Sequence, residues 1–223
     1  MQAIKTLLAT SLAVFTLGAS AAPITYLAAD SSVSSLAQMV NSQAAAANFQ
    51  FVAGALNTVD FETAVPNAVT ISGGHGAVSS HCGSVCGFNT TAAGLYYYSV
   101  VTGSVTFSFV APVDAFGFFV NGLQTEDVTQ QTIVYTDGNS VTSTINMPSA
   151  TNGGGAFVGF IDYGAQISSV TFNATNDILG FDDLRFGRSA GNPNAVPEPG
   201  SLALASLALL GAGAVARKRA IQK

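Results

Sequence analysis

The sequence has few charged residues and almost no cations between its two ends. Only 9% of the 223 residues are charged, against about 25% in an average soluble domain. Between Ala22 and Ala195 the only cations are Arg185 and Arg188, and the same stretch carries eleven acids. A domain with this balance repels phosphate polymers, so nucleic-acid binding is excluded as a function. The 48% content of hydrophobic residues equally excludes a disordered acidic tail.

The chain also lacks the common catalytic motifs. It contains no G-x-S-x-G nucleophile elbow, no P-loop and no H-E-x-x-H zinc motif, and we predict that it is not an enzyme. The alternative is a secreted polysaccharide hydrolase, in which two carboxylates face each other across a cleft at about 5.5 Å or about 6.5–9.5 Å. The acids available for such a pair include Asp114, Glu126, Asp127 and Asp162.

Residues 1–21 have the three parts of a secretory signal peptide. Lys5 supplies the early positive charge, an apolar run extends from Thr6 to Leu17, and Ala19-Ser20-Ala21 form a small-residue cleavage site. The alternative is an N-terminal membrane anchor, but the apolar run is shorter than the about 20 residues of a spanning helix. We therefore predict export, with Ala19 and Ala21 defining the cleavage site and a mature chain that starts near Ala22.

The last 28 residues have a second tripartite pattern. Pro197, Glu198 and Pro199 keep the backbone extended and prevent a helix from starting before Gly200. The stretch 201–216 is uncharged and apolar, and is marginally long enough to cross a bilayer that thins around it. A basic cluster then follows, which would stay on the cytoplasmic side and leave the rest of the chain outside. Its members are Arg217, Lys218 and Arg219.

In this order at the extreme C-terminus, these three parts resemble the PEP-CTERM sorting signal of Gram-negative bacteria. The segment is also similar to what is called the ice-binding protein C-terminal domain. The resemblance implies recognition of Pro197, Glu198 and Pro199 by an exosortase, a membrane-embedded cysteine peptidase, with Arg217, Lys218 and Arg219 stopping transfer. It further implies transient anchoring in the inner membrane, followed by delivery to the cell surface or the exopolysaccharide matrix. The alternative is a plain single-pass anchor with a proline-rich stalk.

Between the two signals, the hydrophobic period changes from helical to strand-like. Apolar residues from Asp30 to Phe49 recur at steps of three and four, with Ser31 or Ser32 able to cap, which predicts one amphipathic helix. After Phe51 short segments rich in Val, Thr, Phe and Tyr alternate with turn residues. The predicted strands are Thr58–Thr63, Ala68–Ser72, Gly94–Val101, Ser104–Val110, Ala115–Asn121, Gln131–Thr136, Ser140–Met147, Ala156–Asp162, Ile167–Asn173 and Gly180–Phe186.

About ten short strands at this spacing predict an all-β fold, an antiparallel β-sandwich of the jelly-roll type, with one N-terminal helix and a C-terminal transmembrane helix. Asp137-Gly138-Asn139 gives a strong hairpin signal between two of the strands. The predicted organisation is a signal peptide at 1–21, a helical segment at 22–50, the sandwich at 51–188, a linker at 189–195 and the sorting signal at 196–223.

Three acids near the two ends of the predicted sandwich suggest a metal site. Glu62 lies in the first strand, and Asp182 and Asp183 lie in the last. An early Phe-Glu paired with a closing Asp-Asp-Leu resembles carbohydrate-binding jelly rolls whose terminal strands share a structural calcium ion. Calcium takes six to eight oxygen ligands, which such carboxylates can supply. Asp182 shares a strand face with Leu184 and should point inward, so the alternative is that backbone amides, Arg185 or Arg188 satisfy it.

Both cysteines and both histidines lie within twelve residues. An exported chain with two cysteines favours a disulfide between Cys82 and Cys86, and the neighbouring glycines allow the tight loop this requires. A zinc site with His75 and His81 and a catalytic thiol are the alternatives, although the spacing does not match a zinc finger.

These patterns together predict an exported, non-catalytic protein of the cell envelope or extracellular matrix, either structural or binding exopolysaccharide. Tyr96, Tyr97 and Tyr98 point alternately to the two faces of a strand, so one ring, for example Tyr97, could stack on a sugar. Ice binding is a weaker alternative, because it needs a flat and regular array of threonines and the threonines are scattered along the sequence.

Overall fold

The computed structural model describes residues 22–79, 86–124, 129–145 and 153–191. They form ten strands, one α-helix and one short 3₁₀ helix, and every strand pair is antiparallel. This confirms the predicted all-β antiparallel sandwich with one helix. The predicted signal peptide, residues 192–195 of the predicted linker and the predicted C-terminal helix lie outside the described residues. The elements are β1 (Ile24–Ser31), η1 (Leu36–Gln38), α1 (Val40–Ala53), β2 (Asn57–Val59), β3 (Val69–Ser72), β4 (Gly76–Val78), β5 (Tyr97–Val113), β6 (Ala115–Leu123), β7 (Thr129–Tyr135), β8 (Ser140–Ile145), β9 (Gly154–Ile161) and β10 (Ile167–Gly187).

The strands form two layers that share the long strands β5 and β10. One layer, the outer sheet, has the order β8-β7-β10-β5-β3, and the other, the inner sheet, has the order β1-β9-β6-β10-β5-β4, with β2 also on β10. The first half of β10 pairs in the outer sheet and its second half in the inner sheet, so the hydrogen-bonded ladder is continuous. A register shift between Ala174 and Ile178 accompanies this change of layer.

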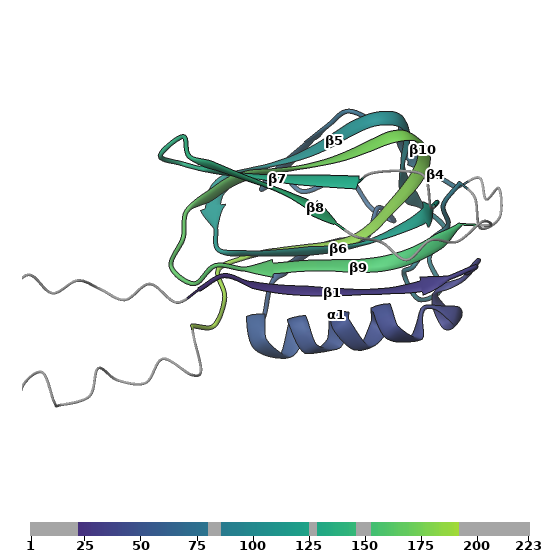
Figure 1. Cartoon of the computed structure of the whole chain (residues 1–223), viewed down its shortest axis with the longest axis horizontal. Coiled ribbons are helices and arrows are strands. Elements are labelled where there is room, and N and C mark those ends of the chain that lie inside the picture. The colour runs from purple at the N-terminus through teal and green to yellow at the C-terminus, as the bar shows by residue number, and fades with distance from the viewer. Residues whose placement is uncertain (1–21, 80–85, 125–128, 146–152, 192–223) are drawn as a thin grey trace, which may run out of the picture.

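The helix covers the far side of the inner sheet, so the molecule has three layers (Figure 1). Every described residue of β6 and β9 is buried, because these strands have the outer sheet on one face and α1 on the other. Phe118 of β6 points into the core between the sheets and contacts Phe172, whereas the next residue, Phe119, packs with Phe157 in the helix layer.

Close packing of the helix depends on a glycine in β9. The ring of Phe49 lies against Phe157 and Tyr26. A Cβ atom at Gly159 would come within 2.9 Å of that ring, which is closer than packed atoms can approach. Glycine is therefore required here for α1 to reach the sheet.

Four of the predicted strands are in fact two. The predicted pair Gly94–Val101 and Ser104–Val110 is the single strand β5, and the pair Ile167–Asn173 and Gly180–Phe186 is the single strand β10. The breaks were inferred from turn residues such as Gly103, which has a φ of 101° but lies within the strand. In an antiparallel sandwich, such residues also allow one long strand to pass from one sheet to the other.

The predicted helix Asp30–Phe49 is corrected at both ends. Residues 24–31 form strand β1, which pairs along its whole length with β9, and the helix runs from Val40 to Ala53. The segment 22–50 therefore contains an edge strand of the inner sheet as well as most of the helix. The capping group also differs from the predicted serines: the amides of Asn41 and Ser42 donate to the carboxylate of Asp30, at 3.0 and 2.9 Å.

The outer face of the outer sheet is lined by uncharged polar side chains in regular rows. Strands β3, β5, β7 and β8, and β10 before Asp177, contain no Asp, Glu, Lys or Arg. Thr106 and Thr171 hydrogen-bond across neighbouring strands at 2.9 Å, as do Thr132 and Thr142. The threonines that are scattered in the sequence are thus gathered in space. The register places one row across all five strands: Ser72, Thr106, Thr171, Thr132 and Thr142.

Candidate functional site

Glu62, predicted as a calcium ligand, holds the loop that leads into β5. Its Oε1 atom accepts hydrogen bonds from the amides of Leu95 and Tyr96, both at 2.7 Å, and from Nδ2 of Asn89 at 2.9 Å. Glu62 lies in the turn that follows β2. The residue before it, Phe61, has a positive φ of 60°. The carboxylate therefore fixes the loop 88–96 against the end of the sandwich.

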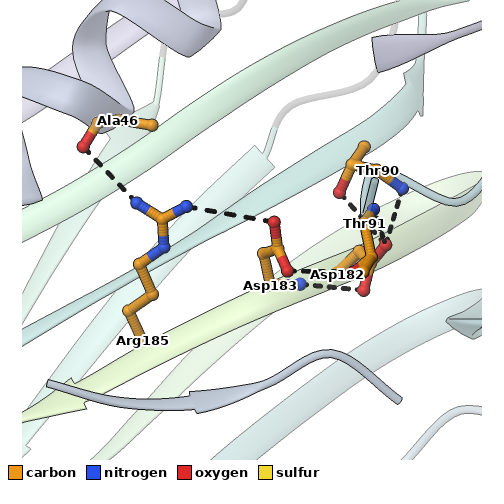
Figure 2. A network of polar contacts seen from close by, with 6 residues as sticks. All are labelled: Ala46, Thr90, Thr91, Asp182, Asp183 and Arg185. Carbon is orange, nitrogen blue, oxygen red and sulfur yellow. Dashed lines mark hydrogen bonds and ion pairs between the residues drawn. The ribbon is translucent and has the colours of Figure 1, made fainter. Parts of the chain in front are cut away.

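Asp182 holds the same loop from the last strand and is fully buried (Figure 2). Its Oδ2 atom accepts from the amides of Thr90 and Thr91, at 2.6 and 3.2 Å, and from the Thr90 hydroxyl at 3.1 Å. Its Oδ1 atom accepts from the amide of Asp183 at 2.8 Å. Burial raises the pKa of Asp182 to about 7; the bond from the Thr90 amide opposes this rise, while the nearby charge of Asp183 adds to it.

Asp183 connects this loop to the helix layer. Its Oδ1 atom accepts from the Thr91 hydroxyl at 3.0 Å, and its Oδ2 atom lies 3.9 Å from the guanidinium of Arg185. Arg185 also reaches the carbonyl of Ala46 in α1 and lies over the Phe119 ring. The network in Figure 2 thus runs from the loop, through β10, to the helix.

The predicted calcium ligands are brought to one end of the sandwich, but amides and hydroxyls donate to Oε1 of Glu62, to both oxygens of Asp182 and to Oδ1 of Asp183, while Oδ2 of Asp183 lies near Arg185. Within the described residues, no group of three or more His, Cys, Asp or Glu side chains could hold a metal ion. The observed geometry matches the alternative in which backbone amides satisfy Asp182. Calcium binding by Glu62, Asp182 and Asp183 remains a prediction.

Backbone strain is concentrated around this network. Phe61, Ala93 and Asp183 have φ values of 60°, 59° and 48°, in the left-handed region that non-glycine residues rarely adopt. Such strain persists only where the surroundings determine the conformation, and it is often found near functional sites. Here the hydrogen bonds to the carboxylates of Glu62 and Asp182 hold the loop in this conformation.

Two further predicted sites are only partly described. Cys86 is disulfide-bonded, while His81 and Cys82 lie outside the described residues, so the pairing of Cys82 with Cys86 remains a prediction. In the tyrosine triplet, Tyr97 is buried and Tyr96 is exposed. Tyr97, the ring suggested for sugar stacking, is therefore not accessible to a sugar in this fold.

The acids considered for hydrolysis have structural partners where they are described. Asp114 accepts hydrogen bonds from the amides of Ser189 and Gly164, at 2.6 and 3.3 Å, and lies 3.7 Å from Arg188. Asp162 accepts from the hydroxyl of Tyr135. Glu126 and Asp127 lie outside the described residues. These contacts give no support to a pair of catalytic carboxylates.

A groove that the sequence did not reveal opens between the edges of the two sheets. Its volume is about 370 Å³, which is within the usual range for ligand sites. Leu27 of β1 and Val141 of β8 stand at its two edges with 40% and 51% of their surface exposed. Apolar side chains dominate the lining and none is charged. The lining residues are Pro23, Thr25, Leu27, Gln131, Ile133, Tyr135, Val141, Ser143, Thr144, Val158 and Phe160.

Two polar side chains stand out in this groove. Gln131 is only 3% exposed, and its Oε1 atom has no hydrogen-bond partner among the described residues. A buried acceptor of this kind is costly unless a donor reaches it. The hydroxyl of Tyr135 donates to Asp162 at 3.0 Å, and burial together with this bond raises the pKa of Tyr135 to about 12, so the groove stays uncharged.

The groove could not have been found from the sequence. Its residues come from four strands, and each looks like an ordinary member of an alternating pattern. The one available signal was Gln131, a polar residue at a position where alternation with Ile133 expects an inward side chain.

Comparison with known proteins gives one clear result. A family model of the PEP-CTERM protein-sorting motif matches residues 195–219. The chain carries a PEP-CTERM sorting motif. This confirms the resemblance inferred from Pro197, Glu198 and Pro199, and it implies export to a surface or extracellular location. The motif lies outside the described residues, and among the residues that are described no helix is long and apolar enough to cross a membrane.

Similarity to solved structures is weak. A point mutant of CBM29-2, a family 29 carbohydrate-binding module, matches with a TM-score of 0.37 and 13% identity, covering 66% of this chain and 99% of that one. TmCBM61, solved in complex with β-1,4-galactotriose, matches at 0.31 and 15%, covering 58% and 94%. The K2 adhesin domain of Lys-gingipain matches at 0.36 and 15%, covering 59% and 99%. At these TM-scores the similarities carry no argument about ligands. No curated protein matches the chain significantly.

Proposed function

We propose that this protein is an exported, non-catalytic component of the cell surface or extracellular matrix that binds a neutral polysaccharide in the groove between β1 and β8. The C-terminal motif supports an exosortase as the processing partner, with the segment 201–216 anchoring the chain in the inner membrane until cleavage. The observation that carries the binding proposal is the buried, unpartnered Oε1 atom of Gln131 in an uncharged groove.

The groove selects a ligand that combines apolar surface with hydroxyl groups. Leu27, Ile133 and Phe160 offer apolar contacts, and Gln131 needs a hydrogen-bond donor. Sugar rings have C–H faces and O–H edges, so one ring can satisfy both requirements. A charged polymer would lose its hydration without gaining a counter-charge, and the acids elsewhere in the domain would repel an anionic one.

The test is binding of the processed protein to the neutral fraction of the producing organism's own exopolysaccharide, measured by affinity electrophoresis in calcium and in chelator. Leu27→Glu places a charge at the groove edge, and we expect at least about a tenfold loss of affinity. Val110→Glu is the matched control, since Val110 is also an exposed aliphatic residue but lies on β5, away from the groove.

A second variant separates binding from folding. Gln131→Met keeps the approximate size of the side chain but removes the unpartnered oxygen. The free protein should be as stable as the unmodified one or more stable, because a buried unsatisfied acceptor has been removed. Affinity for the polysaccharide should fall about tenfold, since one hydrogen bond to the ligand is lost. Unchanged binding in both Leu27→Glu and Gln131→Met would refute the groove as the binding site.

A further inference from the structure

Strand β8 is an edge strand whose side chains are exposed on both faces. It pairs with β7, and no other described element pairs with its free side. Residues 140–144 are all exposed. The backbone groups along its free side are thus available to another strand.

The composition of β8 does nothing to prevent such pairing. Its sequence, Ser-Val-Thr-Ser-Thr-Ile, has high strand propensity and contains no charge and no proline. Proteins normally protect exposed edges with lysine, proline, a bulge or a covering element.

We infer that β8 pairs antiparallel with β8 of a second copy of this chain, so that Thr142 faces Thr142 of the partner across the twofold axis. Residues that face each other must lie on the same face of the sheet, and this holds only when a residue faces its own copy, not when it faces the copy of its neighbour. Thr142 is the central position whose side chain lies on the outer face, opposite Thr132. Two protomers related in this way make one symmetric interface and continue the outer sheet across it.

The proposed register explains why a threonine row ends at Thr142. The row that runs through Thr106, Thr171 and Thr132 reaches the edge of the sheet at Thr142. In the pair, it continues from Thr142 to the partner's Thr142 and along the same row of the second protomer. On the other face, Val141 lies opposite the partner's Ser143, and its exposed apolar surface is covered. Val141 and Ser143 also line the groove, so the pair sets two grooves side by side.

The first experiment measures self-association of the protein isolated from the producing organism, by sedimentation velocity over a range of concentrations. We expect the mass to rise toward about twice that of one chain as concentration increases. Thr142→Lys should abolish this rise, because two ammonium groups would meet on the axis. Thr70→Lys is the matched control, an exposed position in β3 at the opposite edge of the outer sheet, and it should dimerise normally.

The second experiment tests the register. Cysteine at 142 would face its own copy at a separation that a disulfide can bridge, whereas cysteine at 143 would face Val141. Thr142→Cys should therefore give a covalent dimer in mild oxidant, and Ser143→Cys should give several-fold less. A monomer at all concentrations without cross-linking would overturn the inference, and so would preferential cross-linking at 143 or loss of dimer in Thr70→Lys. Thr142 does not line the groove, so polysaccharide binding by the Thr142→Lys monomer tests the proposed function separately.

Discussion

The amide of Thr90 donates a 2.6 Å hydrogen bond to Oδ2 of Asp182, a residue 92 positions later in the chain. This contact, with those from Thr91 and from Asp183 itself, replaces the hydration of a carboxylate that is fully buried. It ties the loop before β5 to the last strand. The closing acidic motif of the sequence therefore has a structural role that does not require a metal ion.

Asp182 should make stability depend on pH in a defined window. Its pKa is raised from 3.8 to about 7 in the folded protein. Below pH 3.8 both states hold the proton; between about pH 4 and pH 7 the unfolded state loses it first, so this group's contribution to the free energy of unfolding falls as pH rises. Asp182→Asn cannot ionise. In urea unfolding at pH 4.5 and pH 7.5, the variant should lose this decrease, whereas Asp137→Asn, at an exposed turn, should retain it. Equal pH dependence in all three proteins would contradict the role of Asp182.

Asp30 should stabilise the start of α1, and its contribution to stability should change with pH in the opposite direction to that of Asp182. Burial alone would raise the pKa of Asp30, but hydrogen bonds from Ser42 and Asn41 outweigh it and lower the pKa below 3.8. Its contribution is therefore present above pH 3.8 and is lost as pH falls through the lowered value. Asp30→Ala should reduce the free energy of unfolding at pH 7 by about 2 kcal/mol. Ser31→Ala, at the neighbouring exposed position, should have little effect in the same urea titration.

Removal of calcium distinguishes the two interpretations of Glu62 and Asp182. A ligand that binds only the folded state raises its stability. Since amides and hydroxyls already occupy Oε1 of Glu62 and both oxygens of Asp182, we expect the same melting temperature in calcium and in chelator. A melting temperature that drops in chelator would instead assign calcium to this end of the sandwich, and Glu62→Gln should then abolish the difference.

Processing at both ends can be read from the intact mass of the protein. We expect the mature chain to start near Ala22 and to lack residues 201–223 in a strain with active exosortase. Replacing Pro197, Glu198 and Pro199 by alanine should leave the C-terminal segment attached and the protein in the membrane fraction. A wild-type mass that still includes residues 201–223 would show that the motif is not cleaved.

The threonine rows should not confer ice binding. The register gathers threonines that the sequence scatters, but neighbouring strands in a sheet are rotated by about 20–25° relative to one another. A row across five strands therefore curves away from any plane, whereas ice binding requires a flat array. We expect no thermal hysteresis in a nanolitre osmometer. A measurable gap between melting and freezing temperatures, lost in Thr171→Lys, would reverse this conclusion.

Local signals in the sequence predicted much of the fold. The alternation around Asp137-Gly138-Asn139 predicted the β7–β8 hairpin, and the turn is observed there, with Gly138 at a φ of 86°. The strand β1 was missed because its residues, Ile24 to Ser31, run without clear alternation into a serine-rich segment that has a helical period. Its strand conformation depends on pairing with β9, more than 100 residues away, which local propensity does not encode.

The sequence by itself determined the sorting motif and the sandwich class, because each depends on residues that are close together in the chain. Only the tertiary structure decided the rest. The partners of Glu62 and Asp182, the groove around Gln131 and the threonine rows all join strands and loops that are distant in sequence. Which strands become neighbours is set by the burial of the whole core, and that choice places an unpartnered amide oxygen in the groove and an unprotected strand at the edge.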